Sequence, residues 1–274
     1  MITAIVLCHP QSKDLLTRRT FNSKILDVKK IACGTTRVKG ADYSESSDFF
    51  PTYASYNSCL FETSVILTAW EHADELIGDN DVAVLHTDIV LKGKANETWS
   101  SLNAELKSDP DRPIGLTIAA AYKGIFNNWL IDENDIFRCN YDPMRIHCFE
   151  NKIYVYDYIK KYDLDIYEFA MDANPLMIYS HQFCITRKAF DVLGDKLMRV
   201  VNRLRLEDIG FWTPHMFERL IALYLAKYIG RPKLTTAFHH FSSSGSFGPG
   251  QLSLYGPRGF KHYRPATRLI NNRA

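Results

Sequence analysis

An acidic side chain interrupts an otherwise apolar stretch in the first third of the sequence. Residues 82–91 read VAVLHTDIVL, an apolar run broken by His86, Thr87 and Asp88. A carboxylate at the end of a buried strand can hold a divalent cation, and such a cation stabilises a departing diphosphate. Asp88 is therefore a candidate metal ligand. His86 either shares that role or contacts the diphosphate in a site without a tightly held metal. Aspartate is also common in turns, and that alternative stays open.

A second acidic group precedes a predicted helix in the last third of the chain. Glu207 and Asp208 stand in RLEDIGFWTP, just before a glycine and two aromatic residues. A carboxylate placed beside a stacked sugar ring could deprotonate an acceptor hydroxyl as a general base. Glu207 and Asp208 are therefore the candidate catalytic residues. Capping of the following helix explains an acidic pair equally well.

Two adjacent histidines end a predicted strand at residues 233–241 (KLTTAFHHF). Neighbouring side chains of a strand point to opposite faces, so only one of the two is expected to face a site. His239 is the candidate metal ligand and His240 the candidate contact to a diphosphate. The Ser/Gly-rich segment that follows could close over phosphate groups as a lid.

Periodicity predicts elements that would hold these residues in place. The apolar pattern predicts strands at residues 2–7, 82–91, 114–122, 176–187 and 233–241, and helices at 58–77, 152–169, 188–204 and 214–229. Pro214 suits the first turn of the last helix. Residues 40–57 and 124–150 are expected to be loops or irregular.

Alternating strands and helices predict an α/β fold with a mostly parallel central sheet. Ligands of such sheets bind beyond the carboxyl ends of the strands. The first strand ends at Cys8 and His9 and the second runs into His86. We expect these ends to line one crevice, which makes Cys8 and His9 candidate donor-binding residues.

Composition excludes several classes of protein. The 274 residues are 46% hydrophobic and 23% charged, as in folded globular proteins rather than disordered or fibrous ones. No run approaches the roughly 18 apolar residues of a membrane span, and the first residues resemble a buried strand rather than a signal peptide. The six cysteines are scattered without a C-x-x-C, which argues against a zinc site or a disulfide framework. We expect a cytoplasmic protein, or one in the host cytoplasm if it is viral.

The charge is distributed unevenly along the chain. From Arg219 to the C-terminus there are nine basic residues and no acidic one, a net charge of +9, whereas the other 218 residues carry 24 basic and 31 acidic groups, a net charge of −7. This asymmetry predicts an anionic partner for the C-terminal part, with Lys261 as a candidate contact. Internal docking on the acidic body is the alternative.

The order of these parts resembles glycosyltransferases of the GT-A type. CLFETSVILTAW, VAVLHTDIVL, LMIYSHQFCITRKAFD and GFWTPHMFERLIALYL also resemble segments of a glycosyltransferase family from bacterial capsule and surface-polysaccharide clusters, first described as a domain of unknown function. The resemblance covers residues 55–95 and 175–228 and departs at 86–88, where that family more often has a His-Tyr-Arg-like segment. It implies these site candidates: Glu62, His86, Asp88, His181, Glu218 and Arg219. Acids on amphipathic helices usually face solvent, which is the alternative for the two glutamates.

These observations favour an enzyme that moves a sugar from a nucleotide-diphosphate sugar to an acceptor hydroxyl, using Mn²⁺ or Mg²⁺. Residues 1–241 would form one α/β domain, and residues 242–274 a basic extension that packs on the site or closes over it. The resemblance implies a glycan acceptor. The basic, aromatic tail would also suit duplex DNA, as in bacteriophage enzymes that glycosylate hydroxymethylated bases. A non-catalytic nucleic-acid-binding protein is the third possibility.

Overall fold

A computed structural model describes most of the chain outside its C-terminal part. The described residues are 1–8, 19–34, 38–45, 48–49, 60, 62–87, 89–91, 93–117, 155–173, 178, 181–209, 213–242 and 245–246. The predicted loop at 124–150 lies outside them, as do most of 40–57 and 242–259 and the second half of the predicted strand at 114–122.

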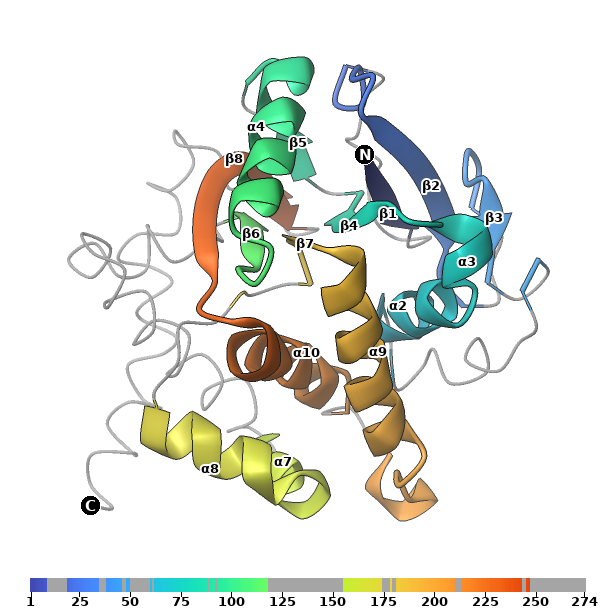
Figure 1. Cartoon of the computed structure of the whole chain (residues 1–274). Helices are drawn as coiled ribbons and strands as arrows, with labels where there is room; N and C mark the ends of the chain where they lie inside the picture. Colours follow the sequence, from blue (N-terminus) through green and yellow to red (C-terminus); the bar gives the residue numbers. More distant parts are fainter. Residues whose placement is uncertain are drawn as a thin grey trace.

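A central sheet organises the described chain (Figure 1). Its strand order is β3-β2-β1-β4-β7-β6-β8-β5, and β9 pairs with β8. The strands are β1 (Ile2–Cys8), β2 (Leu26–Ala32), β3 (Tyr43–Ser44), β4 (Asp81–His86), β5 (Ile89–Leu91), β6 (Ile114–Thr117), β7 (Phe183–Ile185), β8 (Lys233–Ser242) and β9 (Gly245–Ser246). Strands β3, β2, β1 and β4 are parallel to one another, as are β6 and β8, whereas β7 runs antiparallel between β4 and β6. The predicted α/β class is confirmed.

Helices cover both faces of the sheet. They are α2 (Glu62–Glu71), α3 (Ala73–Leu76), α4 (Ala95–Ser108), α7 (Val155–Tyr162), α8 (Leu164–Ala173), α9 (Arg187–Val201) and α10 (Thr213–Tyr224), with a 3-10 turn η3 (Leu206–Asp208) and a π-helical turn η4 (Leu225–Ile229). Helices α2, α9 and α10 pack on one face, and α4 packs on the other through Trp99, Leu102 and Leu106. In Figure 1, α7 and α8 form an outer layer beside α10, farther from the sheet.

Alternation of side chains explains the two hydrophobic cores. Every residue of β1 is buried, as expected for a central parallel strand with both faces covered. Ile5 and Leu7 join the core under α2, α9 and α10, whereas Ala4 and Val6 join the core under α4. Among the described residues, no helix is long and apolar enough to cross a bilayer.

The sequence predictions differ from the structure in several elements. Strand β2 and helix α4 were not predicted. The predicted helix 58–77 is divided into α2 and α3, and the predicted strand 82–91 into β4 and β5. The predicted strand 176–187 contributes only Phe183–Ile185 to the sheet. Residues 245–246 of the predicted extension form β9 and pair with β8.

A close contact between helices sets the position of α2. A Cβ atom added to Gly194 of α9 would lie 2.2 Å from the Cγ atom of Trp70 in α2. The two helices therefore approach one another as closely as a glycine allows.

Replacing this glycine should destabilise the protein. We expect Gly194→Ala to lower the free energy of unfolding by about 1–3 kcal/mol, because the indole ring must move within a packed core. Urea denaturation of this variant and of Asp195→Ala, at the neighbouring exposed position on α9, measures the effect. Equal stability of the two variants would contradict the close packing.

Candidate functional site

The candidate site lies where the chain reverses direction across the sheet. From β1 the strand order runs through β2 to β3 on one side, and β4 lies on the other side. Ligands of open α/β sheets bind beyond the carboxyl ends of the strands at such a reversal. Leu7 pairs with His86, and the Cys33 amide donates to the Cys8 carbonyl at 2.9 Å. The predicted proximity of Cys8 and His86 is therefore confirmed.

His181 is a buried residue at this end of the sheet, with contacts to α2 and β4. It precedes β7, is only 6% exposed, and has a φ of 51°. Positive φ is uncommon for a residue with a side chain and is often kept at functional positions. Its Nε2 atom lies 3.3 Å from the Thr63 hydroxyl, and its ring stacks on His86 with centroids 6.0 Å apart.

Charged groups from two helices surround this histidine. Burial lowers the pKa of His181 to about 4, while Glu218 and Glu62 oppose that change and His86 and Arg219 add to it. The imidazole is therefore neutral at pH 7. The two glutamates act on it from the first turn of α2 and from α10.

Arg219 is the most buried charge of the group. Its side chain is 1% exposed, and its Nη1 atom lies 2.5 Å from Glu218 Oε2, whose side chain is 14% exposed. Glu62 and His86 are half-buried. The sequence candidates Glu62, His86, His181 and Arg219 thus come together in space, and Glu218 lies with them.

Glu45 is a buried carboxylate that the sequence analysis missed. It follows β3, is 1% exposed, and accepts hydrogen bonds from the Gly34 amide at 2.7 Å, the Ser64 hydroxyl at 3.1 Å and the Thr68 hydroxyl at 3.3 Å. Burial raises its pKa, and the three donors oppose that change. Glu45 therefore attaches α2 to the carboxyl ends of β2 and β3. The sequence analysis did not select Glu45 because residues 40–57 were expected to form a surface loop.

Two further polar groups are buried near the site. Gln182 is fully buried, and neither its amide oxygen nor its amide nitrogen has a hydrogen-bond partner; the Thr87 hydroxyl is buried in the same way. These statements hold for the described part of the chain.

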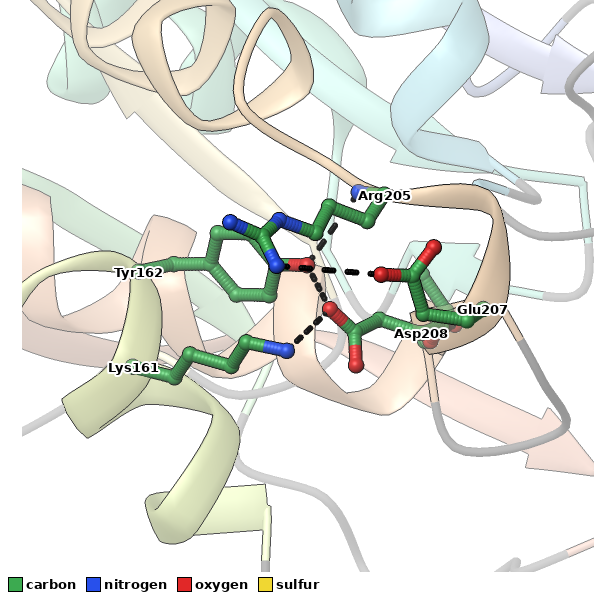
Figure 2. Close-up of polar contacts among 6 residues, drawn as sticks. Lys161, Tyr162, Arg205, Glu207 and Asp208 are labelled. Atoms are coloured by element: carbon green, nitrogen blue, oxygen red, sulfur yellow. Dashed lines mark hydrogen bonds and ion pairs between the residues drawn. The ribbon is translucent and has the colours of Figure 1, made fainter.

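The predicted catalytic pair lies in a different set of contacts (Figure 2). Asp208 Oδ2 accepts hydrogen bonds from Lys161 and Tyr162 at the end of α7. The Arg205 amide donates to the Tyr162 hydroxyl at 3.2 Å, and Arg205 pairs with the exposed Glu207 at 3.8 Å. Lys161, then Tyr162, lower the pKa of Asp208. A lowered pKa weakens Asp208 as a base. The catalytic roles of Asp208 and Glu207 stay predictions.

The predicted metal ligands fall in two paired strands. In the pairing of β5 with β8, Val90 lies opposite His239 and Ile89 lies opposite His240. The backbone of β5 therefore runs beside both histidines, and β5 begins one residue after Asp88. Asp88 itself is outside the described residues, as are His9 and Lys261. Across the described ranges, no three His, Cys, Asp or Glu side chains gather as metal ligands.

Three of the four described basic residues of the C-terminal part form ion pairs with acidic residues. Lys227 pairs with Asp165 at 2.7 Å and Lys233 with Glu105 at 2.7 Å, beside the pair of Arg219 and Glu218. Internal docking therefore accounts for these cations. The five basic residues from Arg258 onward lie outside the described residues.

Comparisons with known proteins give a distant structural similarity and no match by sequence. No protein-family model matches the sequence, and no curated protein matches it. The chain is similar to the apo structure of the bifunctional glycosyltransferase WbbM, with 12% sequence identity and a TM-score of 0.48. The match covers 87% of this chain and 45% of that one, so the chain spans less than half the length of WbbM.

Acid should destabilise the protein through His181. The folded-state pKa of about 4 lies below the ordinary 6.5, so the unfolded state binds more protons between these values. Stability from this group is complete above pH 6.5 and falls by about 3 kcal/mol as the pH drops to 4. Asparagine tolerates a positive φ and does not titrate, so we expect His181→Asn to lack this component. Urea denaturation from pH 7 to 4 should show the free energies of unfolding of the wild type and His181→Asn converging as the pH falls. A constant difference between them would contradict the lowered pKa of His181.

Removing the partner of the buried guanidinium should be costly. We expect Glu218→Gln to lower the free energy of unfolding by roughly 3 kcal/mol, because Arg219 would stay buried without its carboxylate. Glu168→Gln, at an exposed position of α8, should change it by less than about 0.5 kcal/mol. Thermal or chemical unfolding measures both, and an unaffected Glu218→Gln variant would show that the ion pair does not stabilise the fold.

Proposed function

We propose that the chain is a glycosyltransferase that uses a nucleotide-diphosphate sugar. The observation that carries this proposal is the gathering of Glu62, His86, His181, Glu218 and Arg219 at the strand-order reversal. Such reversals are where open α/β sheets bind nucleotides. The resemblance of the same segments to capsule glycosyltransferases supports a sugar donor.

The reaction requires one bond exchange and one proton transfer. The bond between the anomeric carbon and the diphosphate oxygen breaks, and a bond from the acceptor oxygen to that carbon forms. The diphosphate leaves with the bonding electron pair, and a base takes the proton of the acceptor hydroxyl. Asp208 is our proposed base, with Glu207 as the alternative. Both side-chain hydrogen bonds of Asp208 use the same oxygen, Oδ2, and Lys161 and Tyr162 hold it in position.

A divalent cation is part of the proposal. Asp88 and His239 would hold it, and the pairing of β5 with β8 supports their proximity because Val90 lies opposite His239. The cation would stabilise the charge of the leaving diphosphate. Lys261 would contact the same anion. His240 is the alternative to His239, because neighbouring side chains of a strand point to opposite faces.

The proposed acceptor is a glycan hydroxyl. Duplex DNA is the second candidate, and the observation favouring it is the run of basic residues from Arg258 onward without an acidic one. Binding to DNA would weaken steeply as the salt concentration rises, whereas binding of a neutral oligosaccharide would change little.

A donor should stabilise the folded protein. We expect one nucleoside diphosphate, or its sugar, to raise the melting temperature, since a ligand at 100 times its Kd adds about 2.7 kcal/mol. Thermal unfolding with UDP, GDP, ADP and CDP and their sugars, with Mn²⁺ or with EDTA, tests donor and metal together. A response that disappears in EDTA and in Asp88→Asn would support the cation site. Stabilisation by duplex DNA alone would favour the nucleic-acid-binding alternative.

A further inference from the structure

Five residues at the strand-order reversal form two layers, and we refer to them as the carboxylate–histidine cluster. The inner layer is His181 and Arg219, which are 6% and 1% exposed. The outer layer is Glu62, His86 and Glu218, which are half-buried. The outer groups therefore lie closer to the surface than the inner ones.

Two outer residues contact an inner residue, and the third, Glu62, adjoins a residue that does. His86 stacks on His181 with an interplanar angle of 13°. Glu218 Oε2 is 2.5 Å from Arg219 Nη1. Glu62 opens α2, and the next residue, Thr63, contacts His181 at 3.3 Å. The cluster is therefore held in shape before any ligand arrives, as a recognition site requires.

The charge of the cluster argues against a phosphate ligand. The cluster contains two carboxylates and a single guanidinium, which pairs with Glu218, and the His181 ring is neutral at pH 7 because burial lowers its pKa to about 4. A diphosphate placed here would be repelled by both carboxylates.

The chemistry of the same groups suits a neutral polyhydroxyl ring. Carboxylates accept hydrogen bonds only, and a neutral imidazole both donates and accepts. Half-buried carboxylates satisfied by hydroxyl donors form strong, charge-assisted hydrogen bonds. A sugar can supply those donors without bringing a negative charge.

We infer that the carboxylate–histidine cluster binds the sugar ring of the donor, with Glu62 and Glu218 accepting hydrogen bonds from its hydroxyl groups, and that the diphosphate binds outside the cluster. This inference rests on the proposed glycosyltransferase function. It changes the role of Glu62, His86, His181 and Arg219 from contacts to the nucleotide to groups that select the sugar.

The test separates affinity for the nucleotide from affinity for the sugar. Calorimetry measures the Kd values of UDP, UDP-glucose, UDP-galactose, GDP and GDP-mannose for the wild type, Glu62→Gln and Glu71→Gln. Glu71 is the matched control, because it lies exposed at the other end of α2. We expect Glu62→Gln to weaken the preferred nucleotide sugar roughly 10-fold or more and to leave the Kd of its nucleotide unchanged. Glu71→Gln should change neither.

Other results would overturn the inference in distinguishable ways. Equal weakening of nucleotide and nucleotide sugar by Glu62→Gln would place the nucleotide at the cluster, and no change in either would exclude Glu62 from the site. If neither the nucleotides nor their sugars bind the wild type, the proposed function itself fails. As a second measurement on the wild-type protein, the imidazole resonances of His86, assigned with His86→Gln, should shift with the nucleotide sugar and not with the nucleotide. A shift with both would contradict the inference.

Discussion

The arrangement of the candidate site depends on the hydrogen bonds that the buried carboxylate of Glu45 accepts. Glu45 accepts hydrogen bonds from the Gly34 amide and from the hydroxyls of Ser64 and Thr68, and so joins the ends of β2 and β3 to helix α2. A buried carboxylate that lost these donors would be very unfavourable in a low-dielectric core. The three donors stabilise the buried carboxylate, and the same hydrogen bonds fix the position of helix α2.

Helix α2 transmits that constraint to the site. The close contact of Gly194 with Trp70 holds the helix against α9, and Thr63 in its first turn contacts His181. Residues from α2, β4 and α10 then lie around the neutral imidazole of His181, which precedes β7. Charges in this environment interact more strongly than on the surface, which is why the pairing of Arg219 with Glu218 matters.

The catalytic candidates of the acidic pair are organised separately. Asp208 accepts hydrogen bonds from Lys161 and Tyr162, and the Tyr162 hydroxyl accepts one from the Arg205 amide. Helix α7 therefore fixes the turn that precedes α10. The same α10 carries Glu218 and Arg219. One helix therefore links the turn of the proposed base with the cluster proposed to bind the sugar.

The sequence was informative wherever a pattern was local. Apolar runs identified β1, β4 and β8, the spacing of apolar residues identified α9 and α10, and their alternation indicated the α/β class. Strand β2 was missed because LDVKKIA mixes charges with apolar residues and only its last two positions are buried. Helix α4 was also missed, although its buried residues, Ala95, Trp99, Leu102 and Leu106, have the spacing of an amphipathic helix.

Sequence by itself determined the residue types that gather at the site and the strand ends that carry them. Only the tertiary structure decided which of them meet. Thr63 and His181 are 118 positions apart, and no local pattern links them. Whether a glutamate lies on a solvated helix face or is buried, as Glu45 is, depends on packing from segments distant in the chain. The physical reason is that hydrogen bonds and charges act over a few ångströms in space, whereas the patterns of a sequence report only its neighbours along the chain.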